Sequence, residues 1–181
     1  MTNQEQTLLF FDDYFKQHKV DYMIFASSLL HIVREGKLIP EDAEIDIIVQ
    51  GNDLNKHLIE NIFKAAGYWM STYSCKEEYG EMYLTNQSSI QPEYGWIALN
   101  PLWFKKGVCY QNMLDDKCIL WDSKFYEKKT WSTIKYLNRN FKVPNNPEEW
   151  LEKWYGSDWN IPLPGNWRDN KNCKSWDELW H

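Results

Sequence analysis

Two acidic side chains, Glu44 and Asp46, stand two positions apart in an otherwise apolar segment of the chain. This segment, residues 44–49, predicts a buried strand, and side chains two positions apart on a strand share one face. Two carboxylates this close repel each other unless a cation lies between them. Hard divalent ions bind such oxygen pairs together with the phosphates of a substrate. The pair therefore predicts a site for Mg²⁺ or Mn²⁺ that handles a phosphate.

The residues before this strand offer a second feature that a phosphate requires. Ser27 or Ser28 suits the N-cap of a short helix, and Gly36 suits its end. The free N–H groups and positive end of such a helix attract anions beside the seryl hydroxyls. Arg34, near the far end, could bind a phosphate through its planar guanidinium. The alternative for Arg34 is a simple ion pair with Glu35.

This stretch resembles the signature of the LicD/fukutin-type phosphotransferases, which runs roughly Gly-Thr-Leu-Leu-Gly-x-Val-Arg, a spacer ending in Ile-Pro, then Trp-Asp-x-Asp-Ile-Asp. The positions that match in register are Ser28, Leu29, Leu30, Val33, Arg34, Ile39, Pro40, Asp42, Ile45 and Asp46. Residues 143–159 are similar to the closing segment of the same family. Two such signatures in the family's order are more specific than a lone Asp-x-Asp motif.

The resemblance implies an α+β fold of the nucleotidyltransferase type, with a mixed sheet flanked by helices. It also implies a metal-dependent transferase that moves a phospho-alcohol unit, such as phosphocholine or a polyol phosphate, from a CDP-activated donor to a sugar or glycan hydroxyl. The family's catalytic acids correspond to Asp42, Glu44 and Asp46, of which the last two would hold the metal. Its substrate-binding positions correspond to Ser27, Ser28 and Arg34.

The chain departs from this pattern around the turn and the acids. Ser27 and His31 stand where the family has glycines, and Glu41 stands in place of the tryptophan before the acids. The first acid of the central pair is Glu44 instead of aspartate, which keeps the charge but moves it outward by one methylene. On a short helix, His31 is more typical of a packed or surface residue than of a general base.

A later strand departs more seriously. The family pattern there is apolar-Asp-apolar-aromatic-Pro, and this chain has Ala98 at the position of the expected third carboxylate. A methyl group binds no metal. Either Glu81 or Asp42 substitutes for the missing acid, or the site holds metal weakly, or it no longer turns over. The alternative function is therefore a catalytically degenerate relative that binds a nucleotide, a glycan or a partner protein.

The composition bounds the class of protein. With 181 residues and 43% apolar content, the chain can form one hydrophobic core, and we expect a single domain over residues 1–181. The net charge of −6 argues against a nucleic acid or an anionic membrane as the main partner. The four cysteines have no disulfide or metal-ligand spacing, and no segment is apolar over membrane-spanning length. These features favour a cytoplasmic protein without a membrane span.

Tryptophan is unusually frequent, with 11 in the chain and six of them after position 149. Trp brings a large apolar surface and one polar N–H, so such residues suit either a packed aromatic core or a platform for a sugar. Trp faces also hold choline-like ammonium groups. The sequence leaves these alternatives open.

The remaining pattern predicts the elements that position the candidate site. Helices are expected over residues 6–17, 54–66 and, after an N-cap at Asn146, from Pro147 to before Gly156. Strands are expected over residues 20–25, 44–49, 68–73, 82–85, 96–99 and 118–121, with a hairpin of 131–137 and 141–143 about a turn at 138–140. From about residue 161, the Trp- and Pro-rich tail is expected to be irregular.

Overall fold

The computed structural model describes residues 1–39, 44–50, 69–74, 81–86, 96–105, 108–112, 117–162 and 173–175. Over these residues the chain mixes helices with β-sheet, as the sequence predicts. Two predictions lie outside the described residues: the helix over 54–66 and the placement of Asp42.

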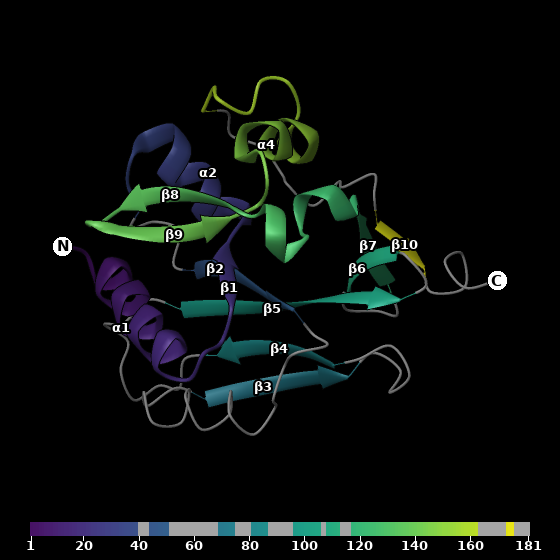
Figure 1. The fold of residues 1–181 in the computed structure, drawn as a ribbon, viewed down its shortest axis with the longest axis horizontal. Helices are drawn as coiled ribbons and strands as arrows, with labels where there is room; N and C mark the ends of the chain where they lie inside the picture. The colour runs from purple at the N-terminus through teal and green to yellow at the C-terminus, as the bar shows by residue number, and fades with distance from the viewer. Residues whose placement is uncertain are drawn as a thin grey trace.

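A six-stranded mixed sheet forms the centre of the protein, with strand order β1-β2-β5-β6-β7-β10 (Figure 1). The strands are β1 (Tyr22–Ile24), β2 (Glu44–Gln50), β5 (Trp96–Lys105), β6 (Val108–Asn112), β7 (Lys117–Trp121) and β10 (Cys173–Ser175). β2 and β5 are parallel, and the other neighbouring pairs are antiparallel. Two two-stranded sheets accompany it: β3 (Trp69–Ser74) with β4 (Glu81–Asn86), and β8 (Ser132–Tyr136) with β9 (Arg139–Val143).

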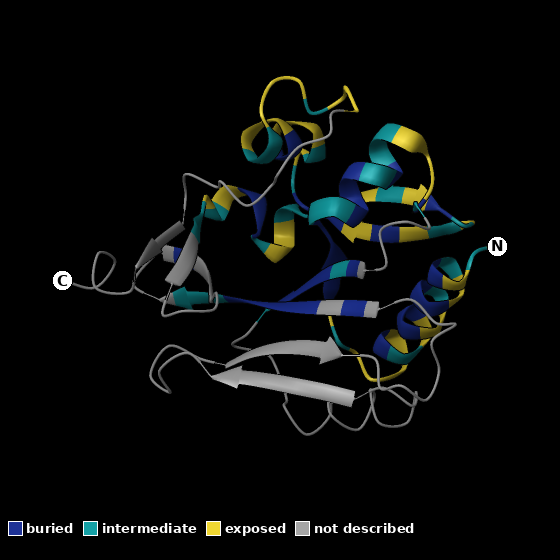
Figure 2. Ribbon diagram, turned by 180° about the vertical axis from the view of Figure 1, so that it is seen from behind, coloured by how far each residue is buried: buried dark blue, intermediate teal, exposed yellow. Residues whose placement is uncertain are grey.

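The described helices are α1 (Asn3–Gln17), α2 (Ala26–Glu35) and α4 (Pro147–Tyr155). Two 3₁₀ turns, Ser123–Phe125 and Lys128–Thr130, follow β7. Buried residues run along β2 and β5 and over the inner faces of α1 and α2 (Figure 2). No helix in the described part of the chain combines the length and apolar character that crossing a membrane requires.

The first helix forms as predicted but begins earlier. Thr2 is its N-cap: the Thr2 hydroxyl accepts from the Glu5 N–H, and the Glu5 carboxylate accepts from the Thr2 N–H. This reciprocal pair satisfies two backbone donors at the start of the helix. Leu8, Phe11 and Phe15 are buried on one face of α1. Their near-helical spacing is the pattern that predicted the helix.

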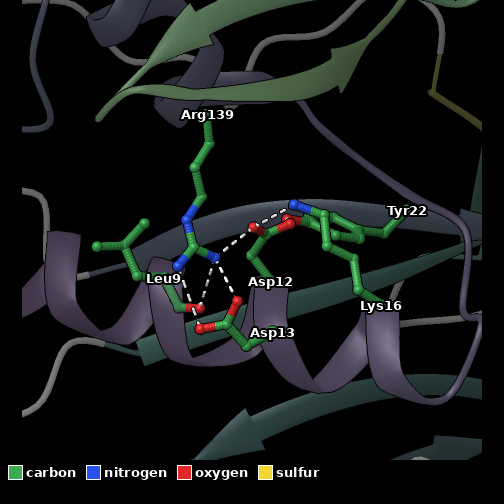
Figure 3. Close-up of polar contacts among 6 residues, drawn as sticks. All are labelled: Leu9, Asp12, Asp13, Lys16, Tyr22 and Arg139. Atoms are coloured by element: carbon green, nitrogen blue, oxygen red, sulfur yellow. Dashed lines mark hydrogen bonds and ion pairs between the residues drawn. The ribbon is translucent and has the colours of Figure 1, made fainter.

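The predicted hairpin is present as β8 and β9, but its turn begins before the expected residues 138–140, because Arg139 already pairs with Tyr136. Its two-residue turn has Leu137 and Asn138 at φ of 48° and 60°, the left-handed pair typical of a type I′ turn. The turn places Arg139 at the start of β9, where its guanidinium reaches Asp12 and Asp13 of α1 (Figure 3). This contact ties the hairpin to the first helix.

Two strands in the second half of the chain were not predicted. One is β6, and the other is β10, in which Cys173–Ser175 of the tail expected to be irregular pairs with β7. Both strands are short and lack a clear alternation of polar and apolar residues. Their backbone groups gain partners from neighbouring strands, which is information that local sequence does not carry.

Candidate active site around Asp46

Asp46 lies on β2 beside the first turn of α2. The Asp46 carboxylate oxygen Oδ2 accepts the Ser27 hydroxyl at 2.6 Å and the Ser27 backbone N–H at 3.2 Å. The Asp46 backbone N–H donates to the Ser28 hydroxyl at 2.8 Å. The strand and helix are therefore joined at the residues that the sequence singled out, and the Asp46 side chain is only half-buried.

The start of α2 differs from the prediction. The N-cap is Phe25, which makes no side-chain capping bond, so neither Ser27 nor Ser28 is the N-cap. Both serines lie within the first turn and turn their hydroxyls to Asp46. The Asp46 carboxylate, which lies on the adjacent strand β2, caps the helix in place of a serine. A negatively charged acceptor is stabilised by the positive end of a helix. The end of α2 is as predicted, with Gly36 in the left-handed region at φ of 70°.

Ala26, the first residue of α2, has a φ of 49°. A left-handed conformation costs a non-glycine residue about 1–2 kcal/mol because Cβ crowds the backbone. The strain occurs one residue before Ser27, whose N–H points to Asp46. The family's turn glycine was matched to Ser27, whereas the structure places the left-handed residue at Ala26.

We expect Ala26→Gly to raise the free energy of unfolding by up to about 1 kcal/mol, because relief of the left-handed cost exceeds the added entropy of the unfolded chain. Urea denaturation measures the change. Gly36→Ala is the reverse control: its φ is also positive, and a Cβ there meets no atom within 4 Å. That variant should lose stability by about 0.5–1 kcal/mol, free of any steric clash. A destabilised Ala26→Gly protein would show that the turn is not strained.

The other predicted site residues are placed as follows. Arg34 follows Ser27 by seven residues on α2, about 10 Å along the helix axis. Its Nε lies 2.7 Å from Glu35 Oε1, and its Nη1 donates to the Trp159 carbonyl at 3.3 Å. Thus α2 carries Arg34 away from Asp46, toward the turn that follows α4. His31 lies on the same helix and is half-buried. Glu44 is the first residue of β2, and its side chain is outside the description.

The parallel pairing of β2 with β5 places Ala98 opposite Asp46, and Trp96 opposite Glu44. A carboxylate at position 98 would therefore stand beside Asp46 on the neighbouring strand. In the predicted metal site, this is the position of the third carboxylate, and this chain has a methyl group there.

Residues 19–146 match the model of the LicD/FKTN/FKRP nucleotidyltransferase domain. The chain belongs to the LicD family. The match spans most of the chain, so the family resemblance is confirmed. The protein is therefore a transferase of the nucleotidyltransferase superfamily. No curated protein matches this LicD-family chain.

Two solved structures share its fold. The lincomycin-bound crystal structure of the lincosamide antibiotic adenylyltransferase LnuA aligns with a TM-score of 0.55 and 17% identity, over 82% of this chain and 84% of that one. The solution structure of the antibiotic-resistance factor ANT(2'')-Ia aligns with a TM-score of 0.51 and 11% identity, over 88% and 74%. These similarities confirm the predicted nucleotidyltransferase-like α+β fold in a single domain.

The donor chemistry at Asp46 fits a hard divalent cation. Carboxylate oxygens are the ligands that Mg²⁺ and Mn²⁺ prefer. Glu44 adds a second acid two positions before Asp46 on β2 of the LicD-family chain. Among the residues whose side chains are described, no cluster of three His, Cys, Asp or Glu is present. A complete ligand set would therefore draw on Glu44, substrate or solvent oxygens.

One residue next to Asp46 was missed by sequence reasoning. The Phe25 N–H donates to the Asp46 carbonyl at 3.2 Å, and its ring contacts Trp121 and Trp150 with centroids 6.5 and 6.2 Å away. Phe25 thus links the candidate site of this LicD-family chain to an aromatic cluster formed by β7 and α4. Its position directly before the serine turn is a sequence signal, but the partners lie about a hundred residues away.

Proposed function

We propose that this LicD-family chain is a metal-dependent transferase that moves a phospho-alcohol unit from a CDP-activated donor to a sugar or glycan hydroxyl. The observation that carries the proposal is the junction of β2 and α2. There, Ser27 donates two hydrogen bonds to the Asp46 carboxylate, and the Ser28 hydroxyl accepts a hydrogen bond from the Asp46 N–H. An acid oriented at the positive end of a helix is suited to a site for phosphates and a cation.

In this proposal, Asp46 and Glu44 hold Mg²⁺ or Mn²⁺. When bound, the cation neutralises charge on the phosphate oxygens and orients them for in-line attack. Ser27 fixes the Asp46 carboxylate with two hydrogen bonds, and Ser28 fixes the strand backbone beside it. The acceptor oxygen bonds to the phosphorus that carries the alcohol, and the bond from this phosphorus to the bridging oxygen breaks, so that CMP leaves. The proton of the acceptor hydroxyl goes to a carboxylate of the site, for which Asp42 is the candidate by its place in the family signature.

Arg34 has a conditional role in the proposal. Its guanidinium is paired with Glu35 and the Trp159 carbonyl. The pyrophosphate of the donor would have to replace one of these contacts, and its two negative charges together compete well with a single carboxylate for a planar guanidinium. Arg34 is therefore proposed as a donor-binding residue that exchanges its contact with Glu35 for one with the donor.

A second candidate function is a degenerate relative that binds a nucleotide, a glycan or a partner protein without turnover. The register of β2 with β5 favours it, because Ala98 occupies the place beside Asp46 where a third acid would stand. Such a protein would lack the charge needed to hold the cation firmly.

A thermal-shift panel tests the proposal. CDP-choline, CDP-ribitol, CDP-glycerol, CTP and UDP-sugars are each added with and without Mn²⁺ to the parent and to Asp46→Asn. A ligand at 100 times its Kd stabilises by about 2.7 kcal/mol, or about 5–11 °C in Tm for a chain of this size. We expect a CDP-alcohol to give this shift only with Mn²⁺, and Asp46→Asn to abolish it. Asparagine keeps an oxygen for Ser27, so the site geometry is preserved.

The matched control is Asp158→Asn, an exposed aspartate near the C-terminal end of α4. It should respond to donor and metal as the parent does. If no nucleotide responds to Mn²⁺ in the parent, or Asp46→Asn responds equally, the catalytic proposal fails. A metal-independent nucleotide shift would instead support the degenerate binder.

A further inference from the structure

A hollow of about 250 Å³ opens between β7 and α4. The residues that matter in its wall are Trp121, Asp122, Phe125, Trp150, Lys153 and Trp154. Pockets for drug-sized ligands run from about 300 to 1,000 Å³. The hollow is therefore of the size that one small ring fills.

Three tryptophans form one side of the hollow. The Trp121 ring stacks on Trp154 with centroids 4.6 Å apart and on Trp150 with centroids 5.6 Å apart. Trp150 and Trp154 are also nearly parallel, with 17° between their planes. Trp150 is fully buried, whereas Trp121 and Trp154 keep part of their surface exposed. The accessible aromatic surface is therefore that of the last two rings, already stacked on each other.

The polar side of the hollow carries balanced charge. Lys153 Nζ lies 3.2 Å from Asp122 Oδ2, and Lys124 Nζ lies 2.6 Å from Glu149 Oε1. Both ammonium groups also lie over the Phe125 ring, 5.5 and 4.8 Å from its centroid. Within the wall, Asp122 is thus matched by Lys153, and outside it Glu149 is matched by Lys124. An uncharged ligand finds a hydrogen-bond acceptor at Asp122 and a donor at Lys153.

The tryptophans of the hollow's wall are connected to the candidate active site through Phe25. The Phe25 ring touches Trp121 and Trp150, and its N–H donates to the Asp46 carbonyl. Ser27, two residues on, holds the Asp46 carboxylate. A wall tryptophan and then Phe25 therefore connect the hollow to the backbone of Asp46.

We propose that this hollow binds one neutral sugar ring of the acceptor, with the apolar face of the sugar on the exposed surface of the stacked pair of Trp121 and Trp154 and its hydroxyls on Asp122 and Lys153. The inference rests on the proposed function, since it locates the acceptor of that reaction. A sugar ring needs one aromatic face and a few polar partners at its edge, which this wall provides.

Two other occupants fit the wall less well. A quaternary ammonium would be repelled by the lysines that already lie over Phe125, and the nearby carboxylates are paired. A nucleobase is held best between two separated aromatic faces. Here Trp121 and Trp154 are stacked directly on each other, so no gap is left between them.

The test uses the full chain with neither nucleotide nor metal. Saturation-transfer NMR titrations measure binding of a panel of methyl glycosides, with choline and cytidine as separate probes. We expect a glycoside to bind, and Trp154→Leu to weaken its affinity about tenfold. Trp159→Leu, a half-buried tryptophan of the same region outside the hollow, should bind as the parent does. Lys153→Ala, at an exposed position on α4, should weaken binding without affecting folding.

Several results would overturn the inference. These are no binding of any glycoside, equal binding by Trp154→Leu, or binding of choline or cytidine in place of sugar. The glycoside titration contains no donor and no cation, so it is independent of the thermal-shift panel. If glycosides bind but no CDP-alcohol shifts the Tm, this inference holds and the proposed reaction is wrong. If a CDP-alcohol shifts the Tm but no glycoside binds, the proposed reaction holds and the hollow is not its acceptor site.

Discussion

The Trp150→Ala protein is expected to lose about 3–5 kcal/mol of its free energy of unfolding. Trp150 is 1% exposed and packs against Phe25, Trp121 and Trp154. Its indole N–H donates to the hydroxyl of Tyr126, which is also fully buried. Truncation leaves a cavity and an unpaired buried hydroxyl, and both costs add. The midpoint and slope of urea denaturation measure the loss.

Two variants separate these contributions. Trp150→Phe keeps most of the ring volume but removes the donor to Tyr126, so we expect a smaller loss of about 1–3 kcal/mol. Trp159→Ala removes a tryptophan that is only half-buried and should cost less than Trp150→Ala. A loss below about 1 kcal/mol for Trp150→Ala would mean that α4 does not depend on this contact.

The second large effect is expected for Asp12→Ala, at about 2–4 kcal/mol. Asp12 is 1% exposed and accepts bonds from Lys16 at 2.6 Å, Arg139 at 2.6 Å and the Tyr22 hydroxyl at 2.8 Å (Figure 3). One carboxylate thereby joins α1, β1 and the hairpin. Its removal leaves the buried Tyr22 hydroxyl without this acceptor. The expected loss is moderate because the Arg139 side chain is 30% exposed, so that water can solvate its guanidinium when Asp12 is removed.

The loss of stability caused by Asp12→Ala should depend on pH. Burial alone would raise the pKa of Asp12, but hydrogen bonds from Lys16, Arg139 and Tyr22 outweigh it and leave the pKa below its usual value. The unfolded chain therefore binds the proton more readily than the folded one. The contribution of Asp12 is complete above the unfolded pKa of about 3.9 and is lost as the pH falls through the folded pKa.

Urea denaturation of parent and Asp12→Ala between neutral and acidic pH measures this dependence. The difference between the two proteins should be largest near neutrality and narrow below about pH 4. Asp13→Asn is the matched control: Asp13 also pairs with Arg139, but its side chain is 64% exposed, and we expect a small loss. An equal loss for both aspartates, or a difference that does not change with pH, would contradict the role given to Asp12.

Much of the architecture could be predicted from local patterns. The spacing of Leu8, Phe11 and Phe15 predicts α1, and the apolar run after Glu44 predicts β2. Asn146, Pro147 and Gly156 mark the ends of α4 as expected. Asn146 is the N-cap residue, but its side-chain amide donates to the Glu149 carboxylate and makes no capping hydrogen bond. These features are local because helix ends and alternating patterns depend on residues a few positions apart.

The pairing of the site residues needed more than local pattern. The sequence identified Ser27, Ser28 and Asp46 but assigned the serines to capping, whereas the strand carboxylate caps the helix in their place. The left-handed backbone at Ala26 likewise had no local signal, since alanine is a good helix former. Which acceptor a helix end receives depends on what packs beside it.

By itself, the sequence determined the family, the fold class and the strand that carries the acids, because these are encoded in residue types at short spacing. Only the tertiary structure decided that Ala98 stands opposite Asp46, and that Phe25 meets Trp121 and Trp150 beside a hollow. Those contacts join residues separated by tens of positions. Their formation is governed by strand register and the packing of the whole core, which no local window of sequence contains.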